Sequence, residues 1–479
     1  MTGQCKFDGN LFCFFLPTHK KEEENPTHIA HIAKAPQASA ETKALPKSAI
    51  LPTHNLNNHL NNLKLKNMNK VIHALYVFGV IILLASCGNS GKKTNEKITP
   101  KDSIKAKTIK PTVNVYIENS GSMDGYVKGV TGFEQAVYSY LSTINRRDLT
   151  DSLNLNYINS TILSQNPDVE DFIEKLEPTT FKQKGGNRKF TEISDIIETI
   201  LKETNENTIS ILVTDGVFSL GGSIDSREYL INQQIGISND VTEFLKKHSK
   251  MAIVVYQLSS NFDGQYFYFD KNLGRENGKH IIDNRPYYIW LIGDIENVSK
   301  FYKEIPDHKI VGSGVENNFS IISDQLSINY AVHENSGNFI ISLDNPKTEI
   351  KKLGKDKISK NVQFSVNVDF SKLLLNDEYL FDTSNYEVIG SYKITVTKAS
   401  QNNHNYTHSI NFTSDRVHKG EIIVRLKKQM PRWVEERNDN DGYSYVKDKT
   451  FGIFSQLKGV FDAFTDRSKY YTEIKVNIN

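Results

Sequence analysis

Residues 113–125 read VNVYIENSGSMDG, in which a β-branched, apolar run passes directly into a polar turn with two serines. The first five residues are typical of a β-strand, and the small hydrogen-bonding residues after them are typical of a turn. The short apolar run Ile209–Val213 repeats this arrangement, because Thr214-Asp215-Gly216 follows it at once. Each run therefore predicts a buried strand that ends in polar side chains.

The segments between and after these two runs alternate between helical and strand periodicity. Apolar residues recur at helical spacing in 132–144 and in 191–201. Further strands are expected at 153–158, 251–258 and 287–292, and further helices at 241–248 and 297–305. This alternation predicts an α/β domain over residues 111–317, with a doubly wound, mainly parallel sheet.

Open sheets of this kind bind ligands at the carboxyl ends of their strands. Three segments are expected to meet there: residues 118–122, Asp215, and Thr191, which opens a helix after a glycine-rich loop. The hydroxyls of Ser120 and Ser122 can both face one hard cation, and nearby carboxylates can hold the water ligands of that ion. An ion held in this way keeps an open position for a partner's carboxylate, which favours recognition over bond cleavage.

These segments resemble the metal-ion-dependent adhesion site of the von Willebrand factor type A domain, which combines Asp-x-Ser-x-Ser, a threonine and a Thr-Asp-Gly turn. The matching residues are Ser120, Ser122, Thr191 and Asp215, and Glu118 stands where the family has its first aspartate. The resemblance implies Mg²⁺ or Mn²⁺ as cofactor and a protein with an exposed carboxylate as partner. The extra methylene of Glu118 moves its carboxylate by roughly 1 Å, so this acid can serve through water, whereas direct ligation would leave a weakened site.

The N-terminal part contains a second recognisable pattern. A basic start at Met68-Asn69-Lys70 precedes the apolar run 71–85, as in a secretory signal peptide over residues 68–86. Its ending, Leu84-Ala85-Ser86-Cys87, resembles the lipobox of bacterial lipoproteins. The resemblance implies that Cys87 is lipidated and anchors the protein in the cell envelope. The residues just after Cys87 are not acidic, which favours a lipoprotein that faces the periplasm. The alternative is a membrane anchor with an incidental cysteine.

Two flanking segments complete the expected organisation of the N-terminal part. Residues 1–67 lack a helix or strand period, so we expect them to be disordered or to precede the true start at Met68. Residues 87–110 are polar and lysine-rich, which predicts a flexible tether.

The region 318–479 is expected to be a β-rich, sandwich-like domain, because short alternating runs follow one another there. A helix is expected at 451–464, covering either this sandwich or the α/β domain, and a final strand at 471–479. The aromatic run 266–269 is either a binding surface or, as we favour, a packed hairpin. Residues 437–448 resemble an EF-hand loop, but Arg437 stands in its first position, so a solvated turn is expected.

Composition narrows the choice of function. A net charge of +2 excludes a strongly basic nucleic-acid binder, and three cysteines exclude a disulfide framework. Three hypotheses remain: an envelope protein that binds a partner's carboxylate through its metal, a metal-dependent hydrolase, and a metal-free scaffold. No base accompanies Ser120 in the sequence, which weighs against the hydrolase.

Overall fold

The computed structural model describes residues 110–479, except for 166–167, 190–191, 221, 223–224, 335 and 401–404. The predicted signal peptide, Cys87 and Thr191 lie outside the described residues. Within that described part, no helix is both long enough and apolar enough to span a membrane.

A seven-stranded sheet forms the centre of the α/β part, in the order β3-β2-β1-β4-β6-β5-β7. Its strands are β1 (Thr112–Glu118), β2 (Ser152–Ile158), β3 (Ile162–Gln165), β4 (Thr208–Thr214), β5 (Met251–Asp270), β6 (Arg275–Asp294) and β7 (Val315–Ile322). Strand β1 pairs in parallel with β2 and β4, and the other four pairings are antiparallel. Strands β1, β2, β4 and β5 therefore point the same way, and the predicted α/β sheet is confirmed at this level.

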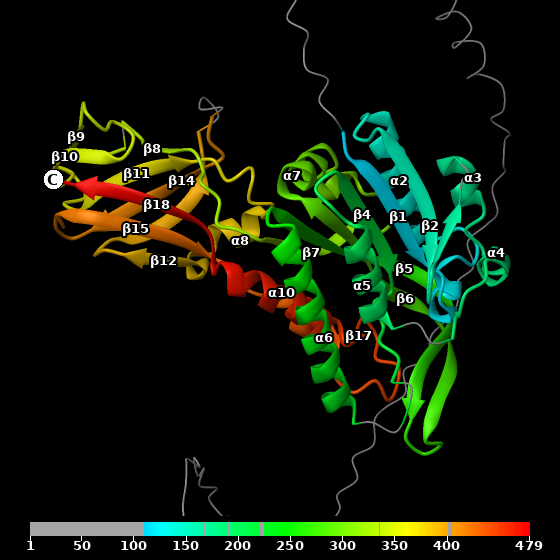
Figure 1. Cartoon of the computed structure of the whole chain (residues 1–479). Helices are drawn as coiled ribbons and strands as arrows, with labels where there is room; N and C mark the ends of the chain where they lie inside the picture. The colour runs from blue at the N-terminus through cyan, green and yellow to red at the C-terminus, as the bar shows by residue number, and fades with distance from the viewer. Residues whose placement is uncertain are drawn as a thin grey trace, which may run out of the picture. The chain divides into compact units, whose positions relative to one another are not determined.

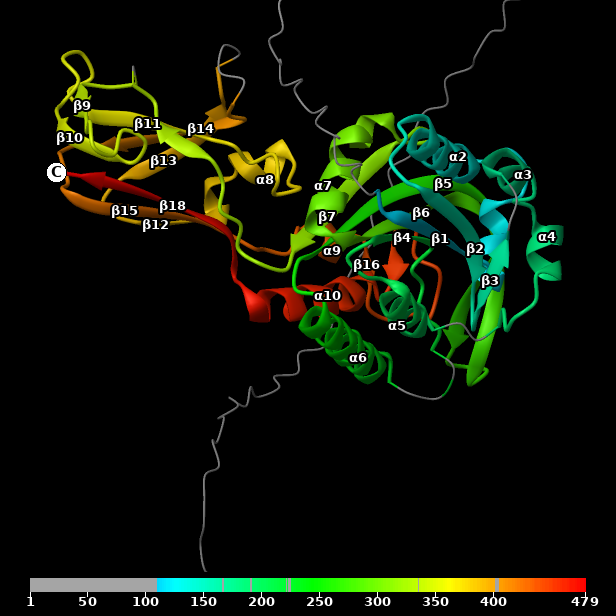
Figure 2. The same cartoon turned by 45° about the horizontal axis from the view of Figure 1, so that its top comes forward.

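Helices cover both faces of this sheet (Figure 2). The helices of the α/β part are α2 (Gly132–Arg146), α3 (Val169–Glu174), α4 (Pro178–Gln183), α5 (Ile193–Glu203), α6 (Ser226–Lys247) and α7 (Ile295–Glu304). Alternation along β1 explains the two layers, because Val115 and Ile117 join one buried cluster with Phe133 of α2, whereas Tyr116 joins another with Ile196 of α5. Both faces of the central strands are thus buried.

Strands β5 and β6 form a hairpin of 20 residues each. Their inner halves lie within the sheet, where β7 pairs with β5 as far as Leu258 and β4 pairs with β6 from Tyr288 onward. Their outer halves pair with each other and extend beyond the sheet (Figure 1). The aromatic run 266–269 lies in this extension, so the favoured hairpin is present.

The β-rich part contains two further sheets, in the orders β12-β15-β18-β10-β9 and β13-β14-β11-β8. Their strands are β8 (Tyr330–Val332), β9 (Phe339–Ile341), β10 (Glu349–Leu353), β11 (Val362–Val368), β12 (Tyr386–Ile389), β13 (Lys393–Lys398), β14 (His408–Ser414), β15 (Gly420–Lys427) and β18 (Tyr470–Ile478). Phe364 and Phe412 of one sheet share a buried cluster with Ile422 and Val424 of the other. A short helix, α8 (Asp377–Phe381), lies between β11 and β12 in sequence.

Two boundaries differ from the sequence expectation. The run Phe319–Ile322 was expected to open the β-rich region, but it belongs to β7 and pairs with β5. A short apolar run carries no signal for which sheet it joins, so periodicity alone placed the domain boundary inside a strand.

The segment 429–467 also departs from the β-rich region and packs against the α/β part. It contains α9 (Trp433–Glu436), β16 (Asn438–Asp439), β17 (Thr450–Phe451) and α10 (Ile453–Arg467). Helix α10 shares a buried cluster with α6, and Gln234 of α6 donates to Asp462 of α10 at 3.2 Å. The helix expected at 451–464 was predicted to cover either the sandwich or the α/β domain, and α10 covers the α/β part.

Candidate functional site

The serine-containing turn begins where β1 ends. Glu118 is the last residue of β1, and a short 3₁₀ helix, Gly121–Tyr126, follows Ser120. The Oγ atoms of Ser120 and Ser122 are 2.9 Å apart. Ser120 also hydrogen-bonds the carboxylate of Glu118, which in addition accepts from the Thr214 hydroxyl at the end of β4.

Asp215 lies beside this turn because β4 pairs in parallel with β1. Its Oδ1 accepts from the backbone N–H of Val217 at 3.2 Å, and its carboxylate is hydrogen-bonded by Ser122. The structure thus brings together four of the five predicted metal-site residues, namely Glu118, Ser120, Ser122 and Asp215. The fifth, Thr191, is outside the described residues.

Arg188 holds the serine turn against the loop that precedes α5. Its Nε donates to the carbonyl of Asn119 at 2.7 Å, and its guanidinium pairs with Asp124. In return, the N–H of Gly121 donates to the Arg188 carbonyl at 3.0 Å. Asp124, a residue of this turn, is therefore held in place by Arg188.

The two site carboxylates are strongly buried. Glu118 is 5% exposed and Asp215 is 1% exposed. Burial raises the pKa of Glu118 to about 8, with a further contribution from the Asp215 carboxylate. Burial also raises the pKa of Asp215, although the Arg285 guanidinium acts in the opposite direction. The pair is therefore costly to ionise unless a positive charge lies close by.

Arg285 supplies one such charge. Its Nη2 atom lies 3.6 Å from Oδ2 of Asp215, and its side chain is fully buried. The guanidinium stacks 4.6 Å from the ring centre of Phe262 and 4.7 Å from that of Tyr266. Its nitrogens make no hydrogen bond to any described residue, so Arg285 offsets charge without occupying the hydrogen-bonding positions of the serines.

The donor set fits a small, hard cation. Oδ2 of Asp215 is buried and accepts no hydrogen bond from the described residues, and two hydroxyls and a second carboxylate lie beside it. The described residues contain no cluster of three or more His, Cys, Asp or Glu side chains that could hold a metal. A cation here would therefore depend on serine oxygens and water, as Mg²⁺ and Mn²⁺ accept.

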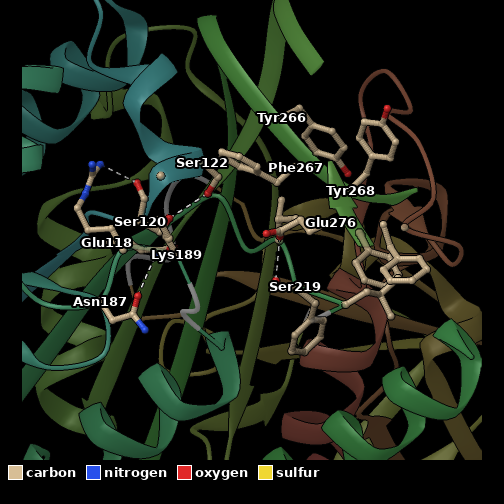
Figure 3. A pocket seen from close by; sticks show the side chains of 18 of the residues that line it. Glu118, Ser120, Ser122, Asn187, Lys189, Ser219, Tyr266, Phe267, Tyr268 and Glu276 are labelled. Carbon is tan, nitrogen blue, oxygen red and sulfur yellow. Dashed lines mark hydrogen bonds between the residues drawn. The ribbon is translucent and has the colours of Figure 1, made fainter. Parts of the chain in front are cut away.

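A cavity of about 680 Å³ opens from the serine turn (Figure 3). Its polar lining includes Glu118, Ser120 and Ser122, and also Ser219 and Glu276, whose side chains are hydrogen-bonded to each other at 3.1 Å. Apolar side chains from the β5–β6 hairpin, the loop after β4 and the C-terminal segment line the remainder: Val217, Phe218, Leu220, Tyr266, Phe267, Tyr268, Phe269 and Phe451. This volume is in the range of ligand pockets.

Close contacts hold the hairpin against the serine turn on one side and against the C-terminal segment on the other. A Cβ on Gly125 would lie 2.4 Å from the Phe262 ring, so only glycine fits there. The N–H of Phe269 donates to the carbonyl of Gly442 at 3.0 Å. The Asp439 carboxylate accepts from the N–H groups of Asp441 and Gly442, so the EF-hand-like stretch forms a turn, but Asp439 is buried rather than solvated.

Sequence reasoning did not find Arg285 or most of the cavity wall. Arg285 precedes the apolar run Tyr287–Ile292, where a charged residue is ordinarily solvated. The run 266–269 was the one available signal, and it lines the cavity as well as forming a hairpin. No protein-family model, curated protein or solved structure matches this chain, so the function has to be inferred from the site itself.

Proposed function

We propose that this protein is a lipid-anchored component of a bacterial cell envelope that binds an acidic group on a partner protein. The anchor would be Cys87, and the binding domain would be a von Willebrand factor A-like domain. The observation that carries the proposal is the convergence of Glu118, Ser120 and Ser122 on the wall of an open cavity, with Asp215 buried beside them. These residues come from the ends of two adjacent parallel strands, where α/β sheets bind ligands.

A bound Mg²⁺ or Mn²⁺ would supply an electrophilic position for a carboxylate of the partner. Ser120 and Ser122 would ligate the ion, and Glu118 and Asp215 would act mainly through water and balance its charge. Arg285 would offset part of the negative charge at Asp215, and Arg188 would hold the serine turn from the loop before α5. Such a site recognises an acidic group and breaks no bond.

One observation favours a second candidate, a metal-free binding domain. The Arg285 guanidinium already places a positive charge 3.6 Å from Asp215. If Glu118 is protonated, this charge balances the site without a metal, and the partner would then bind to the fold alone. This candidate predicts that neither Mg²⁺ nor a chelator changes the thermal midpoint.

Calorimetric titration of Mg²⁺ and Mn²⁺ into the full-length protein tests the proposal. We expect saturable binding by the wild type and its loss in the Ser120→Ala/Ser122→Ala double variant. Ser219→Ala is the matched control, because it removes a hydroxyl from the lining of the same cavity at a residue that is not a proposed metal ligand. Equal binding by the double variant and the wild type, or no binding by either, would contradict the metal site.

A further inference from the structure

The cavity contains a distinct apolar part that the cation site does not use. Phe218, Leu220, Phe267, Phe269 and Phe451 line it, and we call it the aromatic chamber. It lies directly beside the serine turn, because a Cβ on Gly121 would be 3.5 Å from the Phe267 ring. Figure 3 shows Phe267 next to Ser122, at the transition between the two parts of the cavity.

The chamber is assembled from three segments that are far apart in sequence. Phe218 and Leu220 follow β4, Phe267 and Phe269 come from the hairpin, and Phe451 comes from β17. The backbone N–H of Phe218 donates to the carbonyl of Phe451 at 3.3 Å, which ties the C-terminal segment to the loop after β4. Separate backbone contacts thus hold the rings around a shared space.

The charges at the other end complement an acidic ligand. Lys182 and Lys189 line the cavity beside the serine turn, and both are exposed. Neither ammonium forms an ion pair with an acidic side chain in the described part of the chain. Arg188, between them in sequence, is paired with Asp124. The two positive charges therefore lie at the cavity without an ion-pair partner of their own, although Lys182 also acts on the Asp124 carboxylate.

We propose that the partner is a protein segment in which an acidic side chain is followed closely by a large aromatic or aliphatic side chain. This inference rests on the proposed function and specifies its ligand. The acidic side chain would bind at the serine turn, with Lys182 and Lys189 beside it, and the apolar side chain would fill the aromatic chamber. A few buried aromatic anchors commonly dominate the affinity of such contacts.

The shape of the cavity favours a protein segment over a free fatty acid, which also joins a carboxylate to an apolar group. The chamber walls are mostly flat rings, which suit edge or face contact with another ring. Ser219 and Glu276 add a partly exposed, hydrogen-bonded polar pair to the cavity wall, with which an alkyl chain can form no hydrogen bond. A peptide backbone, by contrast, offers N–H groups that a carboxylate such as Glu276 can accept.

Two substitutions of one residue separate the chamber from the cation site. Ser219 is half-buried in the cavity wall and is not among the proposed metal ligands. Ser219 lines the cavity between Phe218 and Leu220 of the chamber, so Ser219→Phe adds a ring there, whereas Ser219→Ala removes only the hydroxyl. Both variants are expected to bind Mn²⁺ with the affinity of the wild type, which also shows that they are folded.

The experiment selects random linear peptides on the full-length protein in the presence of Mn²⁺ and then measures the enriched peptides by fluorescence anisotropy. We expect enrichment of an acidic residue close to an aromatic or large aliphatic one. Ser219→Phe should weaken the best peptide at least tenfold, and Ser219→Ala less than twofold. Replacing the aromatic residue of the peptide by alanine should also weaken binding about tenfold.

Three results would overturn the inference: enriched peptides with an acidic residue alone, equal binding by Ser219→Phe and wild type, or displacement of the peptide by oleate at comparable concentration. Failure of the proposed function is recognised separately. If calorimetry detects no Mn²⁺ binding, the proposed cation site is contradicted. If peptides of the expected composition bind equally well in EDTA, the cation is not required for binding, but the proposed role of the aromatic chamber is supported.

Discussion

Glu118 and Asp215 set the electrostatics of the site at the scale of single residues. They lie at the ends of neighbouring strands, both buried, with one buried guanidinium close to Asp215. When both carboxylates are ionised, the three groups carry a net negative charge in a region where water cannot screen it. This imbalance disappears if a proton or a cation binds.

The first prediction concerns Glu118→Gln in metal-free buffer. The pKa of Glu118 in the folded state is raised to about 8, above the unfolded value, so the folded state holds the extra proton. This contribution to stability is therefore complete below about pH 4.5 and is lost as the pH rises towards 8. Glutamine keeps an acceptor for the Thr214 hydroxyl and carries no charge. We expect the free energy of unfolding to fall more steeply with pH in wild type than in the variant.

Chemical denaturation at several pH values in EDTA measures this difference. Each pH unit in the window corresponds to at most about 1.4 kcal/mol, so the variant should be the more stable protein at pH 8. Thr208→Val, at the other end of β4, is a control that should leave the slope unchanged. If the free energy of unfolding changes equally with pH in wild type and Glu118→Gln, ionisation of Glu118 does not destabilise the folded protein.

The local sequence pattern was sufficient to predict that Ser120 and Asp215 lie close together. It did not predict which group offsets the negative charge of the two carboxylates. Ser120 and Asp215 each follow a short apolar run, and parallel pairing of two such strands places their ends together. Arg285 reaches Asp215 only because β6 pairs antiparallel with β4, and no local period specifies that pairing. A charged residue at the start of an apolar run gives the same signal whether it is solvated or buried.

At the scale of elements, the β5–β6 hairpin shows the same limit. Its inner halves were recognisable as apolar runs, but Ser259-Ser260-Asn261 in β5 reads as a loop in isolation. The strand continues through these polar residues because β6 pairs with it throughout, and Ser260 is used to accept the N–H of Phe133 at 2.9 Å. Long-range pairing thus overrides local propensity.

The second prediction concerns the contact between α6 and α10. A Cβ on Gly459 would lie 2.7 Å from the backbone carbonyl oxygen of Gln234, so Gly459→Ala must push the two helices apart. We expect a loss of about 1–3 kcal/mol in the free energy of unfolding, as in other overpacked interiors. Gly236→Ala in α6 is the matched control, because a Cβ there meets no atom within 4 Å.

The control should change stability in the opposite direction. Alanine favours a helix interior over glycine by about 0.5–1 kcal/mol, so Gly236→Ala should stabilise the protein. Urea denaturation of both variants beside the wild type gives the two values. If Gly459→Ala were as stable as Gly236→Ala, this result would contradict the close approach of α6 and α10 at Gly459.

At the scale of the whole molecule, the chain leaves the α/β part and later packs against it again. Strand β15 ends at Lys427, and the next residues lead to Trp433, whose Nε1 donates to the carbonyl of Asn318 at 2.9 Å. The sequence predicted a sandwich, a helix and a last strand, but the period of a helix does not say which partner it covers. Burial of Leu457 and Val460 against α6 decided it.

The last prediction concerns Lys428, which directly follows the end of β15. It is buried, donates to the carbonyl of Ser323 at 3.3 Å and lies 5.9 Å from the centre of the Tyr471 ring. Burial lowers the pKa of Lys428 to about 7, while Asp324 acts to raise it and Arg467 to lower it. Between pH 7 and about 10 the unfolded chain therefore binds more protons at this position than the folded one, and stability should rise with pH.

Lys428→Met keeps most of the side-chain volume and removes this titration. The difference in free energy of unfolding between wild type and variant should move in favour of the wild type by up to about 1.4 kcal/mol for each pH unit above 7. Taking the difference cancels the groups that titrate in both proteins, including the buried tyrosines. Lys427→Met, at the adjacent and more accessible position, should show no such trend. A difference between wild type and Lys428→Met that is constant from pH 7 to 9 would mean that Lys428 keeps its proton in the fold and reaches water.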